Sequence, residues 1–247
     1  MTENTTEENI QQVPTANPAI EKYLTTGAHI GTRFKSGDMA RYIYKQRRDG
    51  LKVLDVQVID QRVKQVGQFL SKYDPKKIVV VSRKVYGKTP AEEFAKTIGA
   101  SSLTGRFVPG TFTNPQGKEF IQPQVVIITE PESDMQAITE ASHVRAVVIA
   151  LASTNNLLTN VDIAIPINNK GRKSLALVYW LLAREFMVAT GQIANEEAFT
   201  RTVDEFEYPL KDGEAEEQSQ RRGRRERRPM RTNRFEAAAG LGGGDRN

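Results

Sequence analysis

Four short apolar runs separated by helical patterns constrain the fold of this chain more than any other feature. The first run, KKIVVVS at 76–82, is continuous, as expected for a strand that is covered on both faces. Further strand patterns occupy residues 125–129, 146–151 and 163–167. Because helical patterns alternate with these runs, the sequence predicts a mostly parallel sheet with helices on both faces, an α/β sandwich of three layers.

Four helical patterns, before, between and after these strands, place apolar side chains on one face of each helix. The second of them is expected to begin at Pro90, because proline suits the first helical position. The last is expected to begin at Ser174, a candidate N-cap, and to end before Gly191. The predicted helices occupy residues 57–73, 90–98, 134–141 and 174–190.

Cysteine is absent from the 247 residues, and histidine occurs twice, as His29 and His143. This composition excludes a disulfide framework, thiolate zinc sites and cysteine nucleophiles. The two histidines lie far apart in the sequence, so they are predicted to be packing or capping residues. We therefore expect no metal site, no catalytic residue and no cofactor.

Both ends of the chain lack hydrophobic periodicity, so residues 1–19 and 211–247 are predicted to be disordered tails. Residues 20–210 between them are predicted to form a single α/β domain. The acidic N-terminus matches neither a signal peptide nor a transit peptide. The longest apolar stretch, 175–189, is interrupted by charges and is shorter than a membrane span. We expect a cytoplasmic protein without membrane contact.

The segment SRKVYGKT at 82–89 partly matches a phosphate-binding loop, in which backbone amides surround the phosphates and a lysine reaches the terminal ones. Gly87, Lys88 and Thr89 fit that motif, but Ser82 replaces its first glycine. A nucleotide-binding enzyme is therefore the alternative function. For residues 82–89, we favour a surface loop with basic side chains over a phosphate-binding loop. No G-x-G-x-x-G fingerprint occurs anywhere in the chain.

Basic residues give a stronger signal in residues 31–52, where Asp49-Gly50 also predicts the turn of a β-hairpin. Aromatic residues are interleaved with the charges, and such a mixture suits the phosphates and unstacked bases of irregular RNA. A solvated hairpin is the plainer alternative. The residues predicted to contact RNA here are Arg33, Lys35, Arg41, Tyr44, Lys45, Arg47 and Arg48.

Other basic positions extend this prediction. Lys170 and Arg172 precede a predicted helix, where the positive end of the helix dipole attracts anions. An arginine-rich segment, 221–234, can bind phosphate backbones through counterion release. The acidic stretch 196–217 before it suggests either docking to a basic protein or contact with those arginines. Further RNA-contact candidates are Arg83, Lys84, Lys88, Arg106 and Phe107, and in the tail Arg221, Arg222, Arg224, Arg225, Arg227 and Arg228.

Six segments of the chain are long and particular: IEKYLTTGAHIG (20–31), GLKVLDV (50–56), TGRFVPGTFTNP (104–115), VVIITEP (125–131), ITEASHV (138–144) and VDIAIPINNKGRKSLALVYWLLARE (161–185). Together they resemble the universal small-subunit ribosomal protein S2 family. The closer similarity is to its archaeal and eukaryotic branch, whose eukaryotic member is called SA or laminin-receptor precursor. The resemblance runs in order over about residues 18–210, and both tails fall outside it.

The resemblance implies a flavodoxin-like or Rossmann-like α/β/α sandwich without enzymatic activity. It also implies a place in the small ribosomal subunit at the head–body junction, near the mRNA exit. The implied partners are 16S rRNA and neighbouring ribosomal proteins, with no small-molecule substrate. Bacterial members insert a long helical hairpin that is not evident after the predicted helix 57–73, which favours an archaeal source.

The resemblance implies that residues 82–90 form a loop of the ribosomal fold. The sequence leaves open the role of residues 105–114 and whether the protein acts inside the ribosome. The segment GRFVPGTFTN, 105–114, either docks against rRNA or a protein, or packs internally. A free RNA-binding regulator that uses the same fold is a further alternative to a ribosomal component.

Overall fold

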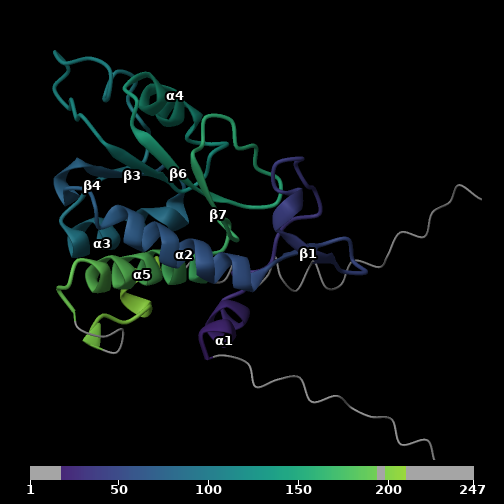
Figure 1. The fold of residues 1–247 in the computed structure, drawn as a ribbon. Helices are drawn as coiled ribbons and strands as arrows, with labels where there is room; N and C mark the ends of the chain where they lie inside the picture. Colours follow the sequence, from purple (N-terminus) through teal and green to yellow (C-terminus); the bar gives the residue numbers. More distant parts are fainter. Residues whose placement is uncertain (1–17, 194–197, 210–247) are drawn as a thin grey trace, which may run out of the picture. The chain divides into compact units, whose positions relative to one another are not determined.

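The computed structural model describes residues 18–193 and 198–209, and Figure 1 shows the ribbon. Five parallel strands form the central sheet in the order β4-β3-β5-β6-β7, which is the 2-1-3-4-5 order of flavodoxin-like folds. The predicted α/β class and parallel sheet are therefore confirmed. In sheet order, the strands are Ser101–Thr104, Ile78–Ser82, Val125–Ile128, Val147–Ala152 and Ile163–Pro166.

Helices cover both faces of the sheet, as Figure 1 shows. One face carries α4, and the other carries α2, α3 and α5, while α1 contacts α2 and α5. The apolar core is divided in the same way, because side chains alternate along each strand: Val80 faces one layer and Val79 the other. The helices α1 to α5 are Pro18–Thr25, Val56–Leu70, Val85–Ile98, Met135–His143 and Arg172–Ala189.

The helix α5 lies largely in the interior, since twelve of its 18 residues are buried. It packs against α2 and α3, and Gly67 permits the close approach of α2, because a Cβ atom there would overlap the Cβ atom of Glu185. The chain after α5 completes this core. Phe206 is fully buried, and the indole Nε1 of Trp180 donates to the carbonyl oxygen of Arg201 at 2.7 Å.

The hairpin predicted around Asp49-Gly50 is confirmed as strands β1 (Ile43–Gln46) and β2 (Lys52–Leu54), which pair antiparallel. The segment before β1 joins it, because a bridge connects Ile30 to Val53. Short 3-10 helices occupy Ala40–Tyr42, Pro75–Lys77 and Asp204–Phe206. Within the part of the chain that the structure describes, no helix has the length and apolar character needed to cross a membrane.

Helix α2 ends at Leu70 rather than at 73, and α4 occupies Met135–His143 rather than 134–141. Three further differences concern where helices begin. The helix α3 begins at Val85, so Pro90 lies inside it and is buried. The N-cap of α5 is Gly171, while Ser174 lies within the helix and its hydroxyl donates to the carbonyl oxygen of Asn168 at 2.7 Å. The helix α1 begins at residue 18, inside the segment predicted as the N-terminal tail. The remainder of that tail, and residues 210–247 with the arginine-rich segment, lie outside the described residues.

Candidate functional site

The carboxyl ends of all five parallel strands meet at one edge of the sheet, which we call the carboxyl edge. In doubly wound folds, ligands bind at this edge, where the strand order reverses. Here the reversal lies between β3 and β5, so the loops that follow these strands are the first place to look for a site. Six of the basic residues predicted from the sequence follow strands of this sheet: Arg83, Lys84 and Lys88 after β3, Arg106 after β4, and Lys170 and Arg172 after β7.

The segment that resembles a phosphate-binding loop is helical rather than a loop. Only Arg83 and Lys84 separate β3 from α3, too few residues to surround a phosphate, and Gly87 and Lys88 lie in the first turn of the helix. Gly87 is packed tightly, because a Cβ atom there would lie 2.9 Å from the Cγ2 atom of Thr129. The prediction of a surface loop at 82–90 is therefore wrong, and its glycine serves close packing of α3 on the sheet.

Lys84 lies at the position where a nucleotide would bind, and it is already paired. Its Nζ atom lies 3.2 Å from Oε1 of Glu130, and both side chains are largely buried. Nearby, the backbone N–H of Arg83 donates to Oδ2 of Asp134 at 3.5 Å. These contacts connect the loop after β3 to the loop after β5 and fill the space at the strand reversal with protein groups.

Burial raises the pKa of the Asp134 carboxyl group to about 6. Between pH 4 and 6 the folded chain therefore holds a proton that the unfolded chain has lost, and stability falls as the pH rises through this range. We expect Asp134→Asn to be more stable than the wild type at pH 7 by up to about 3 kcal/mol, with the difference vanishing near pH 4.

Urea unfolding of both proteins at four pH values between 4 and 7 measures this effect. The exposed Glu132 gives a matched control, since Glu132→Gln removes a neighbouring carboxylate that is not buried. Parallel stability profiles for the wild type and Asp134→Asn would contradict the assignment.

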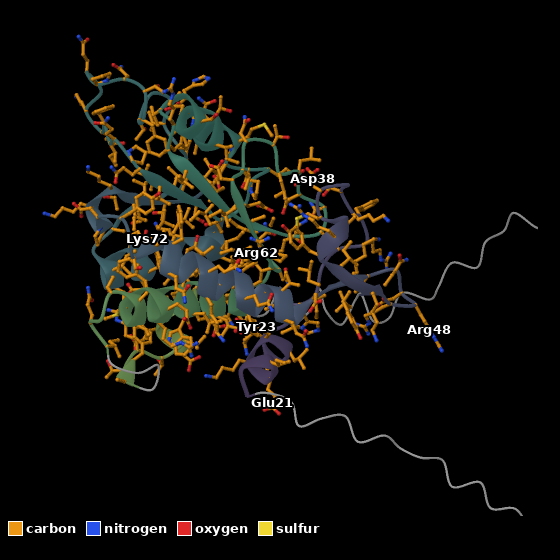
Figure 2. The ribbon with its side chains drawn as sticks, viewed as in Figure 1. Glu21, Tyr23, Asp38, Arg48, Arg62 and Lys72 are labelled. Atoms are coloured by element: carbon orange, nitrogen blue, oxygen red, sulfur yellow. The ribbon has the colours of Figure 1, made fainter. Side chains whose placement is uncertain are left out.

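A second set of candidate residues lies on the β-hairpin, on what we call the hairpin surface. Every member of this set is exposed, and Tyr44 is 70% exposed. The adjacent Phe34 is 78% exposed. Figure 2 shows Arg48 projecting beyond the ribbon at the hairpin, far from Lys72 at the other end of α2. The hairpin surface consists of Arg33, Lys35, Arg41, Tyr44, Lys45, Arg47 and Arg48.

The hairpin surface carries positive charge that is scarcely neutralised. Arg47 lies 3.9 Å from a carboxylate oxygen of Asp49, and both groups are half-exposed. The other five basic side chains of this surface form no ion pair with any residue in the described ranges. Lys45 lies over the ring of Tyr44, with 5.9 Å between Nζ and the ring centroid. Free cations beside an exposed aromatic ring suit phosphates and unstacked bases.

Hydrogen bonds hold the segment before the hairpin, residues 31–36, against the carboxyl edge. The backbone N–H of Thr32 donates to the hydroxyl of Thr154 at 2.8 Å, and the hydroxyl of Ser36 donates to the carbonyl oxygen of Asn156 at 2.7 Å. Gly31 is required at this contact, because a Cβ atom there would lie 2.9 Å from the carbonyl oxygen of Lys52. This segment carries Arg33 and Lys35, and the bridge between Ile30 and Val53 connects it to β2 of the hairpin.

The remaining candidates are also found at or near the carboxyl edge. Lys170 is exposed after β7, whereas Arg172 is engaged, with 2.7 Å between its Nη2 atom and Oε1 of Glu207. Arg106 is exposed after β4, and Phe107 packs edge-on against Phe112 with ring centroids 5.1 Å apart. Within the described residues, the structure thus brings the basic candidates to one edge, with Arg47, Lys84 and Arg172 already in ion pairs.

Glu140 holds the loop after β4 in place, a role that no pattern in the sequence indicates. Its side chain is buried on α4, and Oε1 accepts the backbone N–H of Gly110 at 2.8 Å, while Oε2 accepts that of Phe112 at 3.2 Å. Phe112 is itself buried in the core. Internal packing therefore accounts for this part of the loop 105–114, while Arg106 faces solvent.

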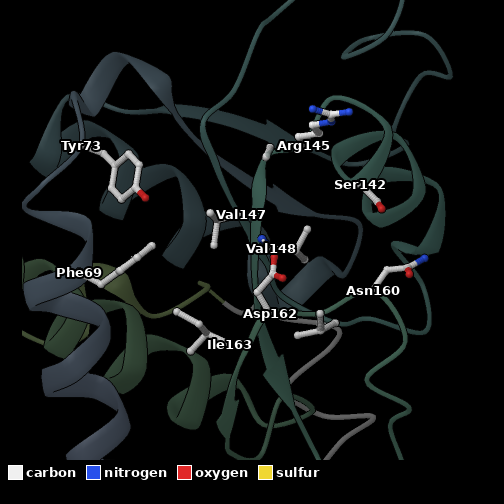
Figure 3. A pocket seen from close by; sticks show the side chains of 11 residues that line it. Phe69, Tyr73, Ser142, Arg145, Val147, Val148, Asn160, Asp162 and Ile163 are labelled. Atoms are coloured by element: carbon white, nitrogen blue, oxygen red, sulfur yellow. Dashed lines mark hydrogen bonds between the residues drawn. The ribbon is translucent and has the colours of Figure 1, made fainter.

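The pocket in Figure 3 has a volume of about 600 Å³ and lies at the amino ends of β6 and β7, away from the carboxyl edge. Phe69 and Tyr73 form one wall, and Asp162 uses Oδ2 to accept the backbone N–H of Val148 at 2.8 Å. None of the candidate residues lines this pocket. Within the described ranges, no cluster of three or more histidine, aspartate or glutamate side chains is placed to hold a metal ion.

The two histidines lie in different parts of the fold, and their predicted packing or capping roles stay a prediction. His29 is partly buried, with Nδ1 3.3 Å from the carbonyl oxygen of Tyr23. His143 is exposed in the last turn of α4, where a basic side chain faces the negative end of the helix dipole.

Comparison with known protein families gives one match that covers most of the described fold. The model of the family described as Ribosomal protein S2 matches residues 23–119 and 117–188. The match takes in the hairpin, all five strands of the sheet and most of α5, and spans well over half of the chain. Its members are structural proteins of the small ribosomal subunit rather than enzymes, and their partners are rRNA and other ribosomal proteins. This chain belongs to the ribosomal protein S2 family.

Proposed function

We propose that this protein is a structural component of the archaeal small ribosomal subunit in the cytoplasm, where its hairpin surface binds 16S rRNA. It would sit at the head–body junction near the mRNA exit and contact neighbouring ribosomal proteins. The observation that carries the proposal is the set of exposed cations around Tyr44, of which only Arg47 forms an ion pair within the described residues. A surface whose backbone already forms a hairpin loses less conformational entropy on binding than an unfolded segment does.

The connection between α2 and β3 supports the archaeal branch. Only residues 71–77 separate the two elements, and they contain a single short 3-10 helix. The long helical hairpin that the resemblance assigns to bacterial members has no room in this connection. The family match itself does not distinguish between the branches, so the archaeal assignment is part of the proposal.

The proposed contacts fall into three groups. The hairpin surface comes first, because its cations are free to bind phosphates. The exposed residues Arg83, Lys88, Arg106 and Lys170 extend it along the carboxyl edge. Lys84 and Arg172 would have to exchange an existing ion pair for a phosphate, which lowers the gain. We also propose that residues 20–210 act as one domain and that the arginines of 221–234 bind rRNA phosphates.

Sucrose-gradient sedimentation of extract from the source cells tests the proposal. We expect the protein in the small-subunit peak at roughly one copy per subunit, and we expect high salt to reduce that amount, because released counterions oppose binding. A free RNA-binding regulator would instead be found near the top of the gradient at both salt concentrations. That result would overturn the ribosomal role.

A further inference from the structure

The end of α4 places an arginine in a backbone conformation that other helices of this chain give to glycine. The helices α1, α3 and α5 are each followed by a left-handed residue, with φ of 69°, 78° and 74° at Gly27, Gly99 and Gly191. The backbone N–H after each of these glycines donates to the carbonyl oxygen five residues earlier. At the end of α4 the same bond joins Ala146 to Ala141 at 2.9 Å, but the left-handed residue is Arg145, with φ of 59°.

No contact with a neighbouring side chain offsets the steric cost at Arg145. In the left-handed region a Cβ atom crowds the following carbonyl oxygen, and glycine avoids this cost. The Arg145 side chain is exposed and forms no ion pair with any residue in the described ranges. Unfavourable backbone conformations of this kind gather at functional sites. An arginine in place of glycine therefore indicates a use for the guanidinium beyond the fold.

Arg145 lines the pocket of about 600 Å³ at the amino ends of β6 and β7, which Figure 3 shows and which we call the amino-edge pocket. Its volume is that of a small-molecule site. The rings of Phe69 and Tyr73 lie at 49° to each other, with 5.0 Å between their centroids. The apolar side chains that line the pocket and are only partly buried in the core include Phe69, Tyr73, Val147 and Ile163. Accessible aromatic rings beside aliphatic groups suit the flat ring of a ligand.

Asp162 is the other charged residue that lines the amino-edge pocket. The bond from the backbone N–H of Val148 to Oδ2 orients its carboxylate, and Oδ1 is free of hydrogen bonds and ion pairs to the described residues. Arg145 and Asp162 line one pocket without forming an ion pair with each other. A ligand that carries both a negative and a positive group can therefore bind between them.

We propose that the amino-edge pocket binds a free aromatic α-amino acid. The carboxylate of the ligand accepts hydrogen bonds from the guanidinium of Arg145, its ammonium group donates to Asp162, and its ring packs against Phe69 and Tyr73. A nucleotide is a poorer ligand, because the carboxylate of Asp162 repels its phosphate and cancels the charge of Arg145. The inference is independent of the ribosomal role, since none of the proposed rRNA contacts lines this pocket.

Titration calorimetry of the purified full-length protein tests the proposal, with L-tryptophan, L-tyrosine and L-phenylalanine as probes. We expect at least one of them to bind at one site per chain. The corresponding arylethylamine lacks the carboxylate and the arylpropionate lacks the ammonium group, so each should bind at least about tenfold more weakly. L-alanine, which has no ring, should not bind measurably. Absence of binding by all three probes, equal affinity for the arylethylamine, or tighter binding of AMP would overturn the inference.

Variants of the two charged residues assign the binding to this pocket. Arg145→Gly and Asp162→Asn should each weaken binding at least about tenfold. Arg145→Gly also removes the steric cost, so it should melt at least as high as the wild type, and damage to the fold cannot then explain its loss of binding. Asp162→Asn keeps an acceptor for the backbone N–H of Val148.

The exposed Lys72 supplies a matched control, because it precedes Tyr73 in the chain but does not line the pocket. Lys72→Gln removes one positive charge, as Arg145→Gly does, and should retain the affinity of the wild type. Unchanged affinity in Arg145→Gly or in Asp162→Asn, or an equal loss in Lys72→Gln, would contradict binding at the amino-edge pocket.

Discussion

Affinity for small-subunit rRNA should fall roughly 100-fold at 0.1 M salt when Arg33, Arg47 and Arg48 are all replaced by glutamine. Each phosphate contact with irregular or single-stranded RNA releases about 0.7 counterion, so each loss costs roughly fivefold at this salt concentration. If all six cations of the hairpin surface bind phosphates, the logarithmic salt slope should be about −4 for the wild type and about −2 for the variant. Filter binding over a range of salt concentrations measures both quantities.

A matched control exists at the opposite edge of the sheet. Lys72, Lys76 and Lys77 are exposed just before β3, and replacing them with glutamine removes the same charge. We expect the control variant to retain most of the affinity and of the salt slope. Equal losses in the two variants would mean that net charge, rather than the hairpin surface, governs binding to rRNA.

Unfolding free energy should fall by about 3 kcal/mol in Glu140→Ala. The substitution leaves the backbone N–H groups of Gly110 and Phe112 without their acceptor, and unpaired donors of this kind cost about 1–3 kcal/mol each. Urea unfolding at pH 7 measures the change. Glu132→Ala removes an exposed carboxylate from the same side of the molecule and should change stability by less than about 0.5 kcal/mol.

The effect of Glu140→Ala should be local as well as global. Hydrogen exchange at the amides of Gly110 and Phe112 should become faster by more than the loss of global stability explains, because the loop 105–114 loses its anchor on α4. Unchanged exchange at these two amides would show that other contacts hold the loop.

The strands of the central sheet were predictable because their sequences are nearly pure aliphatic runs. The runs that became β3, β5, β6 and β7 needed no tertiary information, and the Asp49-Gly50 turn gave the hairpin. The edge strand β4 was not predicted, since its sequence SSLT has no apolar run. Its pairing with β3 determines its conformation, and this pairing is not visible in the local sequence.

The predicted start of α3 at Pro90 is wrong for a related reason, since the helix begins at Val85. Proline was expected at the first helical position, but Pro90 occupies the sixth position and is buried against the core. A proline at that position removes one backbone hydrogen bond near the end of the helix, and burial of its ring offsets part of this cost. The preference of proline for helix starts therefore gave the correct element with a late boundary.

At the candidate site, the sequence indicated which residues are basic but not which of them are free. Lys84 and Arg172 pair with Glu130 and Glu207, which lie 46 and 35 positions later in the chain. Long-range pairs of this kind depend on the fold. Glu140 would be expected from its sequence to lie on a solvated helix face, and only the packing of residues 110–113 against α4 reveals its role.

The burial of α5 has a consequence for how the chain is synthesised. The side chains that fill one face of the core come from Arg172–Ala189 and from Phe206, near the end of the fold, so the first 170 residues to leave the translating ribosome cannot complete that core. The hairpin contacts at Thr154 and Asn156 also form late. The basic hairpin therefore leaves the ribosome before the residues that it contacts have been synthesised. A nascent chain in that condition can associate prematurely with nucleic acid or aggregate.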